Sequence, residues 1–169
     1  NGWRAGWVNT ANLFIREYMC TAAQLAEWEK CRIFASPFAV RLFERKSDKP
    51  KDVNTVVEPD ISVICDPDKI DRIGCRGAPD LMIEIFSPSS RRHDSLTKLN
   101  LYRRAGVREY WLVDAEAGSV QSFLLENGNY FLTGFGQYGD EMKVHVLDGC
   151  TIDLSAVFPE PAPELSDEN

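Results

Sequence analysis

The sequence predicts an α/β fold with a mixed central sheet that is flanked by helices and completed by an antiparallel meander in the C-terminal part. Between residues 80 and 114, an apolar strand, a helix and a second apolar strand follow one another, as in a right-handed crossover between parallel neighbours. After Asp114 the pattern changes to short strands separated by turn residues. With 169 residues, 44% of them apolar, the chain can bury the core of one domain. We expect this domain to span residues 1–158, with an acidic, proline-containing tail over 159–169.

Before residue 80 the sequence predicts one helix, two strands and two polar connections. Thr10 is a suitable cap for the helix, along which apolar residues recur at helical spacing. Pro59 interrupts the second strand, so this strand should start irregularly or lie at an edge. In chain order, we expect a helix over 11–30, a strand over 37–43, a connection over 44–54, a strand over 56–65 and a loop over 66–79.

From residue 80 onward the predicted elements are more regular. Ser89 or Ser90 can cap the helix, which ends near Ala105 because Gly106 follows. Asn127-Gly128 indicates a hairpin turn between two of the later strands. The expected strands cover residues 80–86, 109–114, 119–125, 129–133, 143–147 and 151–154.

The five cysteines indicate neither a metal site nor a disulfide framework. Their number is odd and no C-x-x-C pair occurs, so we expect reduced, mostly core residues of a cytoplasmic protein. No apolar stretch approaches the roughly 18 residues that suggest a membrane span. The cysteines are Cys20, Cys31, Cys65, Cys75 and Cys150.

The formal charge of −7 is distributed unevenly along the chain. Residues 1–114 hold 18 Lys and Arg against 16 Asp and Glu, whereas residues 115–169 hold one Lys against ten acids. Six basic residues lie close together in the first part, so the acidic total does not exclude local phosphate binding. A solvated helix face is an equally good interpretation of this basic cluster. Its members are Arg91, Arg92, Lys98, Arg103, Arg104 and Arg108.

Glu84 is the residue that the predicted sheet explains least well. It lies inside the apolar run Leu-Met-Ile-Glu-Ile-Phe, where an unpaired carboxylate costs on the order of several kcal/mol, so a metal or catalytic site is the first explanation. Asp60 begins another strand-like run, Asp-Ile-Ser-Val-Ile-Cys. If the two strands are neighbours, both carboxylates can share a divalent ion, because Mg²⁺ prefers a few carboxylates plus waters.

Asp80 is a rival of Asp60, since a proline precedes each of them. It lies four residues before Glu84, which along a strand is roughly 13 Å and too far for one ion. Asp80 is therefore expected to anchor a strand start or a loop, and Asp66 and Asp68 are expected to form a turn.

Lys98 is the expected third member of the site. On a helical wheel it projects from the same side as Tyr102, toward the sheet. Two acids and a lysine suit phosphodiester hydrolysis, because a metal lowers the pKa of a bound water and the ammonium orients the hydroxide or stabilises developing charge. An ion pair with Asp94, one helical turn earlier, is an alternative role for Lys98.

Four segments of the chain resemble the Uma-type restriction endonuclease family, which belongs to the PD-(D/E)XK nuclease superfamily. They are residues 57–66, residues 77–90, the pair Lys98-x-x-x-Tyr102 and residues 106–114. The resemblance covers about residues 30–158, and the block from Gly77 to Asp114 is its most specific part. It implies a restriction-endonuclease-like fold and a hydrolase that cleaves DNA with Mg²⁺ or Mn²⁺.

By position, the resemblance implies that Asp60, Glu84 and Ile85 bind the metal, with Asp60, Glu84 and Lys98 as the catalytic residues. The superfamily pattern has a lysine where this chain has Phe86. In this family the lysine has moved to the following helix, where Lys98 fits. The superfamily often adds an acid from its first helix; the acids available there are Glu17, Glu27 and Glu29, and no motif selects one.

The expected partners are nucleic acid, DNA in the first place, and a second copy of the chain, because double-strand cleavage by a one-site domain calls for a dimer. Contacts to the nucleic-acid backbone are expected from Arg91, Arg92 and Arg103. Two other interpretations stay open. One is a non-catalytic nucleic-acid-binding or assembly protein on the same fold, which Phe86 favours. The other is a structural module in which Glu84 and Lys98 form a buried ion pair.

Overall fold

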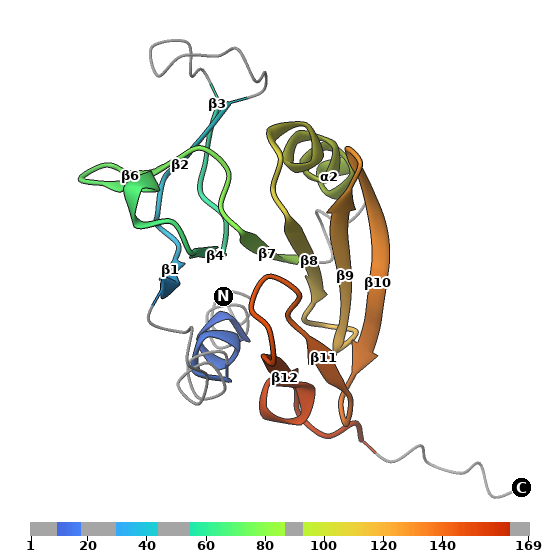
Figure 1. Cartoon of the computed structure of the whole chain (residues 1–169). Helices are drawn as coiled ribbons and strands as arrows, with labels where there is room; N and C mark the ends of the chain where they lie inside the picture. Colours follow the sequence, from blue (N-terminus) through green and yellow to red (C-terminus); the bar gives the residue numbers. More distant parts are fainter. Residues whose placement is uncertain (1–9, 18–29, 44–54, 87–92, 163–169) are drawn as a thin grey trace, which may run out of the picture.

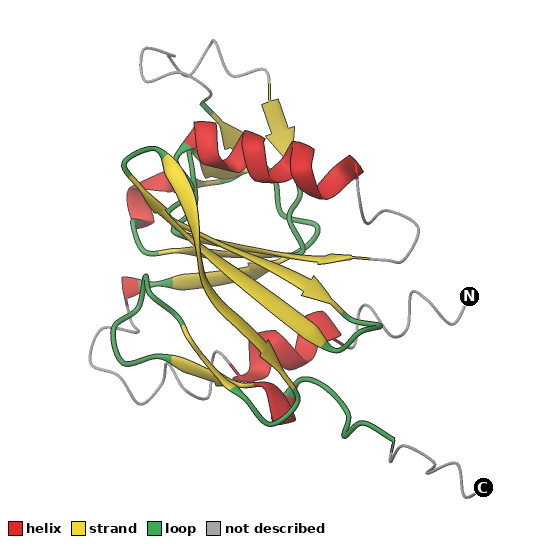
Figure 2. Cartoon of the chain, turned by 90° about the vertical axis from the view of Figure 1, so that its right-hand side faces the viewer, coloured by secondary structure: helices red, strands yellow, loops and turns green. Residues whose placement is uncertain are grey.

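The computed structural model describes residues 10–17, 30–43, 55–86 and 93–162, which form a mixed six-stranded sheet, two smaller sheets and flanking helices (Figures 1 and 2). Residues 10–17 are helical, and helix α2 spans His93–Ala105. The main sheet has the order β1-β4-β7-β8-β9-β10. Its strands are β1 (Arg32–Ala35), β4 (Ile61–Ile64), β7 (Leu81–Phe86), β8 (Glu109–Asp114), β9 (Ser119–Glu126) and β10 (Asn129–Gln137).

The centre of the main sheet is a parallel pair, as the sequence predicts. Strands β7 and β8 run parallel from the pair Leu81 and Glu109 to the pair Phe86 and Asp114, and α2 lies between them in the chain. The other neighbouring strands of this sheet are antiparallel. The mixed α/β fold class is therefore confirmed.

The main sheet separates two apolar cores, because its central strands are buried on both faces. Ile83 of β7 points to one side, where it joins Phe14 of the first helical segment. Met82 points to the other side, which it shares with Tyr102 of α2. Side chains alternate between the faces of a strand, so Glu84 lies on the α2 side, as Met82 does. A run in which both the odd and the even positions are apolar is typical of a strand buried on both faces.

A four-stranded sheet with the order β3-β2-β6-β5 stands beside the main sheet (Figure 1). Its strands are β2 (Val40–Leu42), β3 (Thr55–Val57), β5 (Ile70–Asp71) and β6 (Gly74–Arg76), and a short 3-10 helix, η3, spans Pro67–Lys69. Gly74 has a φ of 126°, and a Cβ there would lie 2.0 Å from the Ala39 carbonyl oxygen, so this close approach requires glycine. The prediction of a loop over residues 66–79 is therefore wrong, because β5 and β6 form a hairpin there.

Two further predictions for the first half need correction. The strand predicted over 56–65 is two strands, since β3 pairs in the small sheet and β4 in the main sheet, with Pro59 between them. Strand β1 was not predicted, and the strand predicted over 37–43 is the shorter β2. Residues 18–29 of the predicted first helix lie outside the described residues.

The C-terminal meander is confirmed for β9 and β10, which extend the main sheet as an antiparallel hairpin. Asn127 and Gly128 both have positive φ at its turn, 50° and 79°, as a two-residue hairpin loop requires. Strands β11 (Glu141–Lys143) and β12 (Thr151–Asp153) pair with each other in a separate two-stranded sheet, followed by the 3-10 helix η4 (Leu154–Ala156). The prediction that all the late strands complete one sheet is thus only partly correct. The strand predicted over 143–147 is wrong, because β11 ends at Lys143 and residues 145–146 form a turn.

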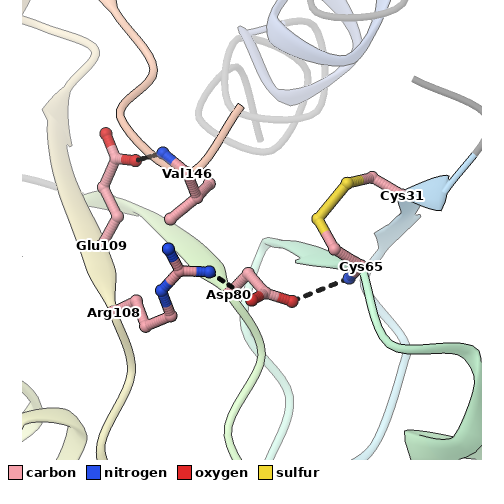
Figure 3. The surroundings of a disulfide bond; sticks show 6 residues. All are labelled: Cys31, Cys65, Asp80, Arg108, Glu109 and Val146. Carbon is pink, nitrogen blue, oxygen red and sulfur yellow. Dashed lines mark hydrogen bonds and ion pairs between the residues drawn. A yellow bond between two sulfur atoms is a disulfide. The ribbon is translucent and has the colours of Figure 1, made fainter. Parts of the chain in front are cut away.

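Cys31 and Cys65 form a disulfide bond, which contradicts the prediction that all the cysteines are reduced (Figure 3). In the antiparallel pair of β1 and β4, Arg32 faces Ile64, so Cys31 and Cys65 occupy the next facing positions. Because β1 was not predicted, this proximity could not be seen in the sequence. Cys75 and Cys150 are free and buried, as expected.

Several predictions concern residues outside the described part of the chain. These residues include Ser89 and Ser90, the connection over 44–54 and residues 163–169 of the predicted tail; residues 159–162 are exposed. The domain limit at residue 158 stays a prediction. Among the described residues, no helix has both the length and the apolar character that crossing a membrane requires.

Candidate metal and catalytic site

Asp60 and Glu84 occupy facing positions on two neighbouring strands. Strands β4 and β7 are antiparallel, and Ile61 faces Ile83, so the next facing positions belong to Asp60 and Glu84. Side chains at directly opposed positions project from the same face with Cβ atoms about 4.5–5.5 Å apart. Both carboxylates therefore lie on the α2 face of the sheet.

Glu84 is buried, with 4% of its surface exposed, and both of its carboxylate oxygens accept hydrogen bonds from α2. Lys98 Nζ donates to Oε2 over 3.0 Å, and the Tyr102 hydroxyl donates to Oε1 over 2.5 Å. Hydrogen bonds to an ionised group are worth about 1.5–3 kcal/mol each, which offsets the cost of taking the carboxylate out of water.

Helix α2 positions Lys98 and Tyr102 on one face, because residues four apart lie one helical turn from each other. The two side chains differ in burial: 31% of the Lys98 side chain is exposed, whereas Tyr102 is fully buried. Burial raises the pKa of Tyr102 far above its usual value, and the neighbouring charges of Glu84 and Asp60 raise it further. Tyr102 therefore remains protonated and acts as a donor.

Asp60 is held at the entrance of β4 by its side chain and by its backbone. Its Oδ2 atom accepts a hydrogen bond from the backbone N–H of Ile85 over 2.7 Å, and its carbonyl accepts one from Ser36 N–H over 3.0 Å. Pro59 precedes it at the break between β3 and β4. Asp60 is 9% exposed, and its carboxylate is hydrogen-bonded to the residue that follows Glu84.

The donor atoms at this place fit a hard cation. Two carboxylates are combined with the peptide group of Ile85, and Mg²⁺ is usually bound by one or two carboxylates and several waters. In the described ranges, no group of three or more His, Cys, Asp or Glu side chains is arranged to hold a metal ion. Asp60 and Glu84 would be the protein carboxylates for such an ion, with waters completing the shell.

Asp80 lies at the other end of this strand pair and does not join the acids. Its Oδ2 atom accepts a hydrogen bond from Cys65 N–H over 2.7 Å, and its Oδ1 atom accepts one from Arg108 over 3.1 Å (Figure 3). The prediction that Asp80 anchors a strand start is confirmed. Asp66 likewise forms a turn, because its carboxylate accepts from Asp68 N–H at the start of η3.

The structure brings Asp60, Glu84, Ile85 and Lys98 together, while their metal-binding and catalytic roles stay predictions. Arg91 and Arg92 lie outside the described residues. Arg103 donates a hydrogen bond to the Gly128 carbonyl in the turn between β9 and β10, over 2.9 Å. Its expected contact with nucleic acid also stays a prediction.

Tyr102 is the neighbour of Glu84 to which sequence analysis gave no role. Its spacing from Lys98 and its place on the sheet-facing side of the helix were visible in the sequence. Its partner was not, because a buried tyrosine at helical spacing is usually a core residue. Only the direction of its hydroxyl distinguishes the two cases.

Comparisons with known proteins bear on the family and the fold of the chain. A family model described as "Putative restriction endonuclease" matches residues 19–155 of the chain. Among solved structures, the chain is similar to "a putative nuclease belonging to DUF820" from Anabaena variabilis, with a TM-score of 0.62 and 16% sequence identity. The alignment covers 88% of this chain and 80% of that chain, and at this identity it bears on the fold alone. No curated protein sequence matches the chain.

Proposed function

The chain belongs to the Uma2 restriction endonuclease family, and from this premise we propose that it is a Mg²⁺-dependent endonuclease that hydrolyses DNA phosphodiester bonds. The observation that carries the proposal is the buried Glu84 carboxylate. It faces Asp60 on the neighbouring strand and accepts a hydrogen bond from Lys98. A buried acid pair with an ammonium beside it supplies negative charge for a cation and positive charge for a phosphate.

Asp60, Glu84 and Ile85 are the residues that would hold Mg²⁺ or Mn²⁺. The ion would lower the pKa of a bound water and neutralise charge on the phosphate. Lys98 would orient the attacking water or stabilise the charge that develops in the transition state. It can do so because it is a partly exposed donor to Glu84. Lys98 thus replaces the lysine that the superfamily pattern has at Phe86.

Substitution of the acids tests this proposal. We expect Asp60→Asn and Glu84→Gln to lower Mg²⁺-dependent nicking of supercoiled plasmid about 100-fold or more. Asp80→Asn is the matched control, because Asp80 also follows a proline, is 8% exposed and pairs with a basic residue, yet lies away from the site. Equal loss of activity in all three variants, or full activity in Glu84→Gln, would contradict the proposed site.

A non-catalytic nucleic-acid-binding or assembly protein is the second candidate function. It is favoured by Phe86 at the usual lysine position and by the ion pair that already holds Glu84. A carboxylate bonded to a lysine and a tyrosine is also compatible with a purely structural role. Salt-dependent DNA binding without cleavage, unchanged in Glu84→Gln, would decide for this candidate. Tight Mn²⁺ binding that Glu84→Gln weakens strongly, but to a level that calorimetry still measures, would decide against it.

The proposal includes a homodimer, with β10 as the contact. This strand is at one edge of the main sheet (Figure 1), and its nine residues contain no charged side chain although the chain is acidic. Edge strands are usually protected from pairing by charged side chains. Because two acidic copies of the chain repel each other least where the surface is uncharged, a long uncharged edge suits pairing between them. Exposed apolar side chains lie along it at Phe131, Leu132 and Phe135.

Light scattering after size exclusion tests the dimer. Leu132→Lys introduces the charge that the edge lacks, and it should convert a dimer into a folded monomer. Val56→Lys is the matched control, because Val56 is equally exposed, at 58% against 59%, but lies in the small sheet. A wild-type monomer at micromolar concentration, or a dimer that Leu132→Lys does not weaken, would exclude β10 as the contact.

We also propose a cytoplasmic location, where DNA is present. The Cys31–Cys65 disulfide makes this part of the proposal testable, since disulfides are rare in that compartment. Alkylation of thiols in intact cells, followed by mass spectrometry, should show Cys31 and Cys65 in their reduced form. If Cys31 and Cys65 instead remain unalkylated in intact cells because they are disulfide-bonded, the protein lies in an oxidising compartment.

A further inference from the structure

We infer that Tyr102 is a positioning residue that fixes the Glu84 carboxylate, so that Oε2, on the Lys98 side, is the oxygen directed to the reaction. The inference rests on the proposed function, since it assigns a task within the same site. It concerns a residue that does not itself contact the phosphate. Three features of the structure carry it.

The first feature is the hydrogen bond itself. The Tyr102 hydroxyl lies 2.5 Å from Glu84 Oε1, within the short range of O–H···O⁻ bonds to an ionised acceptor. Tyr102 is fully buried and Glu84 nearly so, so water cannot easily replace the hydroxyl as a donor. Without it, the inner carboxylate oxygen would lose this donor in a buried place.

The second feature is the way in which Tyr102 itself is held. Its ring packs edge to face against Tyr110 of β8, with ring centroids 5.1 Å apart. Its carbonyl accepts hydrogen bonds from the N–H groups of Gly106 and Val107, over 3.1 Å and 3.0 Å, at the end of α2. Both the ring and the backbone are thus fixed, which places the hydroxyl in one position before any ligand arrives.

The third feature is the difference between the two donors to Glu84. Lys98 has a flexible stem and 31% of its side chain is exposed, whereas Tyr102 is rigid and fully buried. Lys98 can therefore leave Oε2 and donate to a water or a phosphate, while Tyr102 keeps Oε1 in place. The last torsion of a glutamate is otherwise broad, so the carboxylate would turn when Lys98 leaves.

The substitution Tyr102→Phe removes the hydroxyl and keeps the ring. We expect it to weaken Mn²⁺ binding, measured by calorimetry, about 10-fold or more, since loss of a partner that orients a ligand typically has this effect. The Mg²⁺ concentration for half-maximal nicking should rise by the same factor. Tyr130→Phe is the matched control: it also removes one partly buried hydroxyl and its hydrogen bond, which goes to the Val107 carbonyl over 2.8 Å. It should bind Mn²⁺ as the wild type does.

A double variant separates positioning from a general loss of stability. If Tyr102 acts through Glu84, Tyr102→Phe should cause no further loss of Mn²⁺ affinity in a Glu84→Gln background. Unchanged affinity in the single Tyr102→Phe variant, equal weakening by Tyr130→Phe, or additive losses in the double variant would each overturn the inference alone. Wild-type protein that binds no Mn²⁺ would overturn the inference together with the proposed function.

Discussion

The Asp60 carboxylate accepts a hydrogen bond, 2.7 Å long, from the backbone N–H of Ile85, the residue that follows Glu84. One side chain therefore connects the entrance of β4 to the end of β7. Asp60 thus has two roles, as the acceptor for Ile85 N–H and as a proposed metal ligand. Substitutions can separate them, because the hydrogen bond needs only an acceptor whereas the metal needs a negative charge.

The two roles predict different results for two substitutions of Asp60. Asp60→Asn keeps an acceptor for Ile85 N–H, so the free energy of unfolding should fall by less than about 1 kcal/mol while Mn²⁺ binding is lost. Asp60→Ala also removes this acceptor from a buried N–H and should cost about 1–3 kcal/mol more. Urea unfolding and Mn²⁺ calorimetry on both variants measure the two effects. Equal destabilisation by both would show that the bond to Ile85 contributes nothing.

Removal of the Lys98 ammonium should destabilise the protein through Glu84. Lys98→Met keeps the length of the side chain but leaves Oε2 without this donor, and partial exposure limits the expected cost to about 1–2 kcal/mol. The double variant with Glu84→Gln should be more stable than the sum of the single losses predicts, because the two residues interact directly. Strict additivity in thermal unfolding would contradict the ion pair.

Glu109 is a second buried carboxylate, on the face of the main sheet opposite to Glu84. It is fully buried, and its oxygens accept from the Trp111 indole N–H over 2.8 Å and from Val146 N–H over 2.9 Å. Glu109→Gln replaces one carboxylate oxygen by an NH₂ group, which cannot accept the hydrogen bond of Trp111 or Val146. The substitution should therefore lower the unfolding free energy by about 1–3 kcal/mol. Mn²⁺ affinity should not change, since this carboxylate is separated from the site by the sheet. A loss of metal binding with unchanged stability would refute this separation.

The free thiols Cys75 and Cys150 should resist alkylation in the folded protein. Burial raises the pKa of each to about 11, so only a very small fraction is thiolate at pH 8. A raised pKa means that the neutral thiol persists as the pH rises, and the rate of iodoacetamide labelling should increase steeply only toward pH 11. Mass spectrometry of native protein at several pH values checks this, with urea-unfolded protein as the control. Rapid native labelling at pH 8 would show that the thiols are accessible.

Reduction of the Cys31–Cys65 disulfide should lower stability without removing the site. The bond closes a segment of 34 residues, for which the chain-entropy model gives an upper figure of about 4 kcal/mol. Unfolding with and without a phosphine reductant measures the loss, and the Cys31→Ser and Cys65→Ser double variant should behave as the reduced protein does. Equal midpoints in all three samples would mean that the bond does not constrain the unfolded chain.

The residues of the candidate site could be predicted because each one disturbs a local pattern. Glu84 is the only charge in an apolar strand, Asp60 follows the proline that ends one strand and precedes another, and Lys98 lies among apolar residues on its helix. Tyr102 disturbs no pattern, since a tyrosine is expected on that face. A hydrogen-bond partner that comes from another element is not encoded in the spacing of either residue.

The errors in the fold have a different physical cause. Strands β5 and β6 have two and three residues, which is too short for a period to appear. Nothing in the local pattern of residues 55–64 indicates that β3 and β4 belong to different sheets. The disulfide was missed for the same reason, because Cys31 faces Cys65 only through the pairing of β1 with β4.

The partition of the molecule by its main sheet also has a consequence for protein engineering. The proposed chemistry lies on the α2 side, whereas the larger core with Glu109 and Trp111 lies on the other. Cation preference and reaction rate can therefore be redesigned on one side while thermal robustness is improved on the other, with little compromise between the two aims.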